Sequence, residues 1–181
     1  MTRWLPVLAS VLALVVLACG RNEPAEDARG EAIRPEWGVV LPLREGQKLL
    51  ETCARPSPLE LSGRWNPERS EINRLEMRLP AVLGKALAQV ILEEPETLPR
   101  TSDYYRQYAG FYRNGRRVVF VCGIHRAFVE RLEPQTWTRT AMGVDDGGTA
   151  VFGAVYDVDA DAFGPVQFEG RFSGPVRMRP S

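Results

Sequence analysis

The chain has few of the residues on which enzymatic and metal sites usually depend. Its 181 residues include one histidine, His125, and three cysteines, and lysine occurs only at Lys48 and Lys85. A lone histidine without a cysteine cluster argues against a zinc site, and no Gly-x-Ser-x-Gly motif marks a hydrolase nucleophile. Basic and acidic residues balance at 23 each, so no net charge favours nucleic acid. We therefore expect no metal, no cofactor, no catalytic residue and no nucleic-acid partner.

Long apolar runs are also scarce, and the one present lies at the N-terminus. Residues 4–17 are almost entirely apolar, follow Arg3, and lead into the sequence Leu17-Ala18-Cys19-Gly20. The run is shorter than the ~20 residues that a membrane-spanning helix needs. A charged start, an apolar middle and a small residue before the cleavage point are the parts of a secretory signal. With cysteine directly after that point, the segment resembles the lipobox of bacterial lipoproteins.

The lipoprotein resemblance implies the destination of the protein and the division of its chain. It implies cleavage after Ala18, a diacylglycerol on Cys19 and acylation of the new amino group, for example by palmitate. We expect 1–18 to be the signal peptide, 19–36 the lipidated cysteine and a disordered polar tether, and 37–181 a single α+β domain. The residue after Cys19 is Gly20 and not aspartate, which resembles the pattern of lipoproteins sorted to the outer membrane. The lipid-anchored domain would then face the periplasm. The alternative is an ordinary secretory signal with a chance cysteine.

Two cysteines, Cys53 and Cys122, remain in the mature chain. Exported proteins reach an oxidising compartment, where paired cysteines usually cross-link. We expect a Cys53–Cys122 disulfide, which closes a loop of about 70 residues and contributes on the order of 4 kcal/mol. Two buried free thiols are the alternative.

The first half of the domain predicts one long helix. Asn66-Pro67 is a favourable start, because asparagine caps helices and proline suits their first position. An apolar stripe follows at intervals of three and four residues: Ile72, Leu75, Leu79, Leu83, Ala86 and Val90. Pro80 predicts a kink or two abutting helices. A short helical turn is expected near Leu49 and Leu50.

The second half predicts antiparallel strands. Asn114-Gly115 is a strong two-residue hairpin signal between 104–112 and 117–124. It sets Phe111 opposite Val118 and Gln107 opposite Cys122. Further strands are expected at 141–144, 150–156 and 164–172. The predicted fold is α+β, with one long, proline-kinked helix packed on a four- to five-stranded antiparallel sheet, cystatin-like in outline. We expect that helix to cover the core face of the hairpin, which consists of Ala109, Phe111, Val118, Phe120, Cys122 and Ile124.

The opposite face of the hairpin is the candidate binding surface. Tyrosine and arginine are enriched where protein partners bind, and this face gathers several of them beside the only histidine: Tyr104, Arg106, Tyr108, Tyr112, Arg117 and His125. The alternatives are a solvated face or one covered by the N-terminal segment or by Trp137.

Two weaker patterns involve acidic residues. Asp157, Asp159 and Asp161 alternate as in a calcium loop, but the EF-hand glycine and final acid are replaced by Ala162 and Phe168, so a polar turn is expected. His125 could also pair with Asp145 or Asp146 in an envelope hydrolase, the main rival interpretation.

The domain also resembles an uncharacterised family of small proteobacterial exported proteins and lipoproteins. The resemblance covers roughly 65–170 and includes Trp65-Asn66-Pro67, residues 107–110, Trp137 and residues 144–148. Members of that family often have asparagine in place of Cys122 and Cys-Asp in place of Asp145-Asp146, which would make the disulfide particular to this chain. The resemblance implies no activity, cofactor or catalytic residue.

Taken together, these patterns predict a non-catalytic binding or structural module, with a protein or glycan of the envelope as its partner. Location and size also suggest a third possibility, an inhibitor of lysozyme-like enzymes. The Gln-x-Val-x-Gly pattern of inhibitory cystatins is absent, so the expected outline does not imply protease inhibition.

Overall fold

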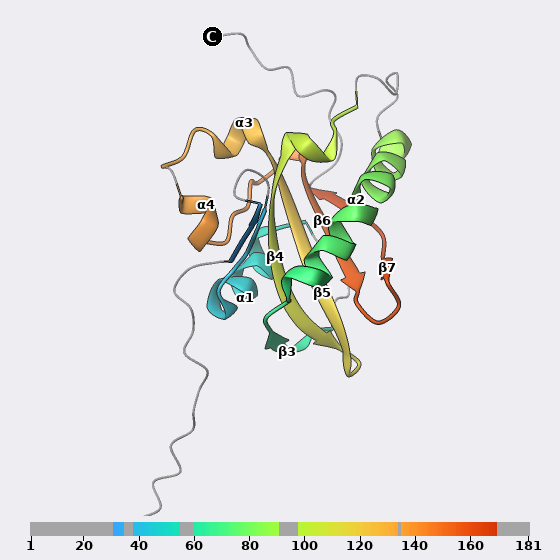
Figure 1. Cartoon of the computed structure of the whole chain (residues 1–181). Helices are drawn as coiled ribbons and strands as arrows, with labels where there is room; N and C mark the ends of the chain where they lie inside the picture. Colours follow the sequence, from blue (N-terminus) through green and yellow to red (C-terminus); the bar gives the residue numbers. More distant parts are fainter. Residues whose placement is uncertain (1–30, 35–37, 55–59, 91–97, 134, 170–181) are drawn as a thin grey trace, which may run out of the picture.

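A mixed β-sheet forms the centre of the molecule (Figure 1). The computed structural model describes residues 31–34, 38–54, 60–90, 98–133 and 135–169. The central strands are β4 (Tyr104–Arg113), β5 (Arg116–His125) and β6 (Gly148–Asp157), and they pair antiparallel. The shorter strands are β1 (Glu31–Arg34), β2 (Gly38–Val40), β3 (Ser62–Trp65), β7 (Ala162–Phe163) and β8 (Gln167–Glu169).

The strand order is β1-β2-β4-β5-β6-β7, with β3 pairing to β4 and β8 to β6. The α+β class is as predicted, but β2 runs parallel to β4, so the sheet is mixed and larger than expected. Residues 141–144 form no strand, and β6 begins only at Gly148. The helices are α1 (Leu43–Thr52), α2 (Arg69–Val90), α3 (Arg126–Val129) and α4 (Thr136–Arg139), and a 3₁₀ turn, η2 (Thr101–Asp103), precedes β4.

The hairpin register follows the Asn-Gly turn as predicted. Asn114 and Gly115 adopt φ values of 51° and 76°, the left-handed backbone that a tight hairpin turn requires. Phe111 pairs with Val118, and Gln107 with Cys122. The local turn chemistry therefore determines which side chains of β4 and β5 share a face.

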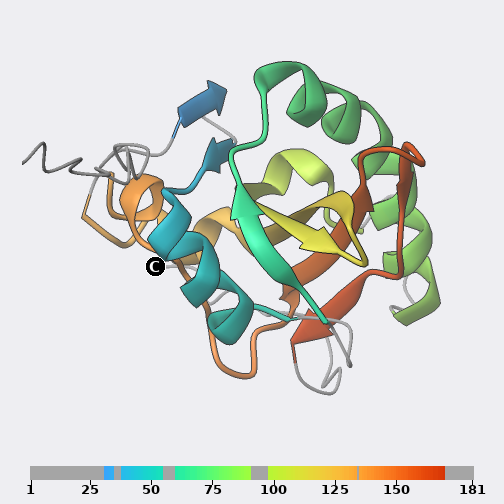
Figure 2. The same ribbon diagram turned by 90° about the horizontal axis from the view of Figure 1, so that it is seen from below.

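The long helix α2 buries its apolar stripe against the sheet. Its buried residues Ile72, Leu75, Leu79 and Leu83 belong to the predicted stripe, and Leu87 extends it. The helix begins at Arg69, two residues after Pro67, and contains Pro80. Figure 2 shows that α2 changes direction part-way along its length, which is the behaviour expected of a helix with an internal proline.

Both faces of the sheet are covered, and α2 lies on the face opposite to the one predicted. Its stripe packs with Tyr104, Tyr108 and Val119. The face of Phe111 and Phe120 packs instead against α1. The prediction of the covering helix was wrong because a period of two shows which residues share a face but not which helix covers it.

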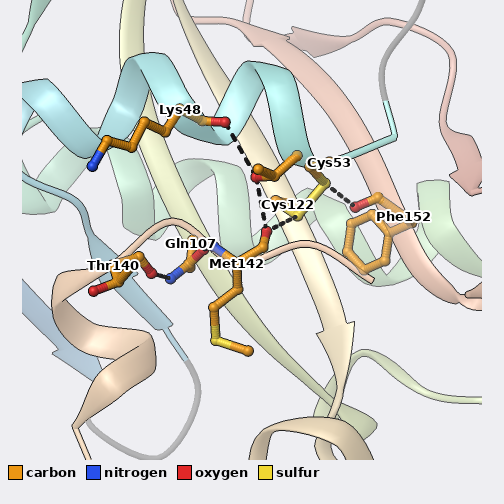
Figure 3. The surroundings of a disulfide bond; sticks show 8 residues. Lys48, Cys53, Gln107, Cys122, Thr140, Met142 and Phe152 are labelled. Atoms are coloured by element: carbon orange, nitrogen blue, oxygen red, sulfur yellow. Dashed lines mark hydrogen bonds between the residues drawn. A yellow bond between two sulfur atoms is a disulfide. The ribbon is translucent and has the colours of Figure 1, made fainter. Parts of the chain in front are cut away.

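The predicted disulfide between Cys53 and Cys122 is present (Figure 3). It joins the end of α1 to β5, with a Cα–Cα distance of 6.0 Å. Next to it, the buried Gln107 amide donates to the carbonyl oxygens of Trp137 and Thr140 at 2.5 and 2.7 Å and accepts from the Met142 amide at 2.9 Å. The disulfide and this amide together hold α1 and the segment after α4 on the same face of the sheet.

The N-terminal boundary of the domain lies earlier than predicted. Glu31–Arg34 forms β1 and pairs with β2, so these residues belong to the sheet and not to a disordered tether. Residues 1–30, including the predicted signal and Cys19, lie outside the described residues. Among the residues described, no helix is long and apolar enough to cross a membrane.

Candidate ligand-binding cleft

A cleft of about 980 Å³ lies between α2 and the segment 98–102 that leads into β4. Its volume is at the upper end of the roughly 300–1,000 Å³ typical of small-molecule sites. Its polar lining comes from Asn73, Glu76, Arg100, Thr101, Ser102 and Arg106. Its apolar lining comes from Met77, Pro80, Leu83, Gly84, Ala88, Leu98 and Pro99.

The floor of the cleft contains a buried ion pair between strand and helix. Arg106 of β4 is 1 % exposed and donates from Nε and Nη2 to the two carboxylate oxygens of Glu76, both at 2.8 Å. This two-point geometry is the strongest arrangement of arginine with a carboxylate. Because Glu76 neutralises it, Arg106 can remain charged under α2 without contact with bulk water.

The same guanidinium also positions the other wall of the cleft. Its Nη1 donates to the backbone carbonyl oxygens of Thr101 at 3.0 Å and Tyr104 at 2.6 Å. Arg106 therefore connects α2, through Glu76, with the segment that faces α2. One side chain therefore contacts both walls of the cleft.

Tyr108 completes this polar cluster. Its hydroxyl donates to Glu76 Oε1 and accepts from Arg106 Nε at 3.2 Å. Burial, together with the nearby Glu76 carboxylate, raises the pKa of Tyr108 well above its usual value. The phenol is therefore neutral at physiological pH and acts as a fixed donor to Glu76.

The predicted binding surface is not one accessible face. Tyr104, Arg106 and Tyr108 do share a face, as the hairpin register predicts, but each is only 1 % exposed. The helix α2 lies on them, because its stripe needs an apolar surface and the opposite face is occupied by α1. Of the three, only Arg106 lines the cleft.

The remaining hairpin candidates lie nearer the surface. Arg117 donates to Glu71 of α2 at 2.7 Å, and its guanidinium lies 5.2 Å from the centre of the Trp65 ring. Tyr112 is half-buried near the turn and pairs with Arg117 across the strands. Neither Arg117 nor Tyr112 lines the cleft.

His125 ends β5 and caps the short helix α3. Its Nδ1 accepts from the Ala127 amide at 3.3 Å, and its ring packs with Tyr104 in a T-shaped arrangement, with ring centres 5.6 Å apart. Burial lowers the pKa of His125 from its ordinary value, although Asp103 partly opposes that change. Within the described residues, His125 forms no ion pair with Asp145 or Asp146.

The alternating aspartates each contact a neighbour in the polar turn after β6. Asp157 Oδ1 accepts from the backbone amides of Asp159 and Ala160, at 3.1 and 2.8 Å. Asp161 holds Arg78 of α2 and accepts from the Tyr156 hydroxyl. The Arg78 hydrogen bond, with that of Tyr156, lowers the pKa of Asp161. The turn is thus tied to α2 by an ion pair.

Sequence reasoning missed Glu76 and the wall segment 98–102. Glu76 lies four residues after Ile72 and three before Leu79, so it borders the apolar stripe of α2. An acid at that edge, combined with an arginine on the strand face, is a signal for a helix–sheet ion pair. This signal can be recognised only when α2 is known to lie on the face of the sheet that carries Arg106.

Comparison with known proteins finds no matching family model, no significantly similar curated protein and no significantly similar solved structure. The resemblance to an uncharacterised exported family therefore stays a prediction, and the function is argued from the site alone.

Proposed function

We propose that this protein is a lipid-anchored binding module of the bacterial cell envelope and that its ligand occupies the cleft between α2 and segment 98–102. The cleft with the Arg106–Glu76 pair in its floor is the observation that supports this most directly. Concave sites with mostly apolar walls and a few fixed polar groups are typical of ligand binding.

Two residues of α2 strengthen the proposal because both are unfavourable inside a helix. Glycine costs about 1 kcal/mol and proline about 3 kcal/mol relative to alanine. Pro80 and Gly84 both line the cleft, and a Cβ placed on Gly84 would meet nothing within 4 Å. The packing of the protein therefore does not require a glycine at position 84, whereas a ligand that occupies the cleft would need the space that a side chain there would fill.

The test of the binding function fills the cleft without disturbing the core. Gly84→Leu adds a side chain to open space, and Ala81→Leu is the matched control on an exposed position of α2 outside the cleft lining. Native mass spectrometry of the mature protein from its own host should show a bound small molecule in wild type and Ala81→Leu but not in Gly84→Leu. Identical spectra for all three, with the fold intact, would remove the cleft as the binding site.

The proposed location rests on the N-terminal sequence. We infer lipidation of Cys19, removal of 1–18 and retention at the periplasmic side of the outer membrane, with the membrane as one partner. Cys19→Ser should leave the protein unlipidated, so that it no longer partitions into detergent as the mature protein does. Unchanged partitioning, with the signal shown to be cleaved, would contradict this assignment.

Two alternatives receive no supporting contact among the described residues. A hydrolase would need His125 beside Asp145 or Asp146, yet its Nδ1 accepts the Ala127 amide. Inhibition of lysozyme-like enzymes would need an accessible protein-binding surface, and two of the tyrosines that suggested one, Tyr104 and Tyr108, are buried. The part of the cystatin-like prediction that matches the structure is the packing of α2 on the antiparallel strands β4, β5 and β6. We propose no inhibitory activity from it.

A further inference from the structure

We propose that the ligand of the cleft is a single-chain amphiphile, an extended apolar chain ending in an anionic group. The inference rests on the proposed binding function and adds the chemistry of the ligand. It follows from three properties of the cleft: its length, the apolar residues of its α2 wall and the exposed arginine on its opposite wall.

The cleft is long and runs along α2. Asn73, Met77, Gly84 and Ala88 recur at helical spacing and line it from one end to the other. The fifteen residue-to-residue steps from Asn73 to Ala88, at 1.5 Å each, give about 22 Å along the path of the helix. A bilayer core holds two opposed acyl chains in about 30 Å, so one chain extends roughly 15 Å. The cleft is therefore long enough for one acyl chain and a head group.

Part of the α2 wall, beside the polar Asn73 and Glu76 of the same helix, suits a chain of methylene groups. Met77, Pro80 and Gly84 have no polar side-chain atom able to donate a hydrogen bond, and Met77 is 76 % exposed. Methionine adapts its shape to apolar partners, so Met77 can contact an apolar ligand in the cleft. An apolar ligand lying on this wall would remove that surface from water.

The opposite wall supplies the charge. Arg106 is neutralised by Glu76 through two hydrogen bonds, so it adds little net charge. Arg100 also lines the cleft and is exposed; its backbone amide donates to the Asp103 carboxylate at 2.7 Å, and no ion pair of its guanidinium is found among the described residues. Thr101 and Ser102, the next two residues in the chain, also line the cleft and carry hydroxyl groups. A carboxylate or phosphate head group would pair with Arg100 and accept from these hydroxyls.

The experiment uses photoreactive probes on the mature, lipidated protein in nanodiscs. Three probes carry the same sixteen-carbon chain (a length of roughly one leaflet) and end in a carboxylate, an alcohol or a quaternary ammonium. Wild type and Ala81→Leu should be labelled on peptides of α2 and 98–102, with the carboxylate preferred roughly three- to tenfold over the alcohol. Gly84→Leu should lose the labelling of these peptides by all three.

The charge is tested separately. Arg100→Gln should abolish the preference for the carboxylate while the alcohol still labels the cleft. The control is Arg113→Gln, which changes an exposed hairpin arginine outside the cleft and should alter neither result.

Equal labelling by the three probes in wild type would overturn the anionic assignment. If no probe labels the cleft although Gly84→Leu loses its co-purified molecule, the ligand is not an amphiphile and the binding function stands. A co-purified peptide or glycan would likewise overturn the inference.

Discussion

Glu76 on α2 holds Arg106 on β4 by two hydrogen bonds of 2.8 Å, although thirty positions separate them in the sequence. Through further hydrogen bonds from Arg106 to the Thr101 and Tyr104 carbonyl oxygens, this pair connects the helix with the opposite wall of the cleft. Its loss should affect stability, because an arginine buried to 1 % exposure would be left without its counter-charge.

Glu76→Gln should lower the free energy of unfolding by about 3 kcal/mol, since breaking a buried pair leaves one charge uncompensated. Urea denaturation of the mature protein measures this change. Glu130→Gln is the control, because it breaks the exposed Arg126–Glu130 pair and should cost under about 1 kcal/mol. The double variant Glu76→Leu, Arg106→Met should be more stable than Glu76→Leu alone. Equal losses for the control and Glu76→Gln would show that the buried pair is not structurally important.

Gly84→Ala should stabilise the protein by about 1 kcal/mol, because alanine is the better helix former and its Cβ enters open space. Gly46→Ala, in α1, should destabilise it, since the new Cβ would lie 2.9 Å from Ala109 Cβ. Thermal unfolding of both variants gives the sign of each effect. Destabilisation by Gly84→Ala would mean that the position is not open as described.

Stability should fall as the pH drops below about 6.5, the ordinary pKa of histidine. Burial lowers the pKa of His125 in the folded state, so between its folded and unfolded pKa values the unfolded chain binds more protons. The stabilising effect of the neutral ring is complete above the unfolded pKa and is lost as the pH falls through the folded pKa.

His125→Asn should flatten this dependence between pH 5 and 7, because His125 is the only histidine of the chain and asparagine can still accept the Ala127 amide. Denaturation midpoints at several pH values provide the measurement. A slope that persists in the variant would have to come from another group and would contradict the assignment.

Reduction of the disulfide should lower the free energy of unfolding by about 4 kcal/mol, since Cys53 and Cys122 lie 69 residues apart and the loop they close is long. Urea unfolding with and without reductant measures the difference. The mature protein should have no free thiol apart from any unlipidated Cys19, and quantitative alkylation of Cys53 before reduction would contradict the disulfide.

The local parts of the fold were predictable because neighbouring residues determine them. The Asn114-Gly115 turn set the register of β4 and β5, and the spacing of Ile72, Leu75 and Leu79 marked the buried side of α2. The pairing of Cys53 with Cys122 was predictable because they are the two cysteines outside the predicted signal and lipidation site, in a chain predicted to reach an oxidising compartment. Each of these depends on a short-range rule or on a single available partner.

The tertiary structure alone decided which helix covers which face of the sheet, and with it the site. Strand periodicity is symmetrical between two buried faces, so Tyr104 and Tyr108 could be grouped by sequence but not assigned to solvent or core. Only the packing of α2 on that face brings Glu76 to Arg106 and creates the cleft beside Gly84. The sequence by itself determined the long helix with its apolar side and the register of the central hairpin, whereas long-range packing determined which surface was left open as a cleft.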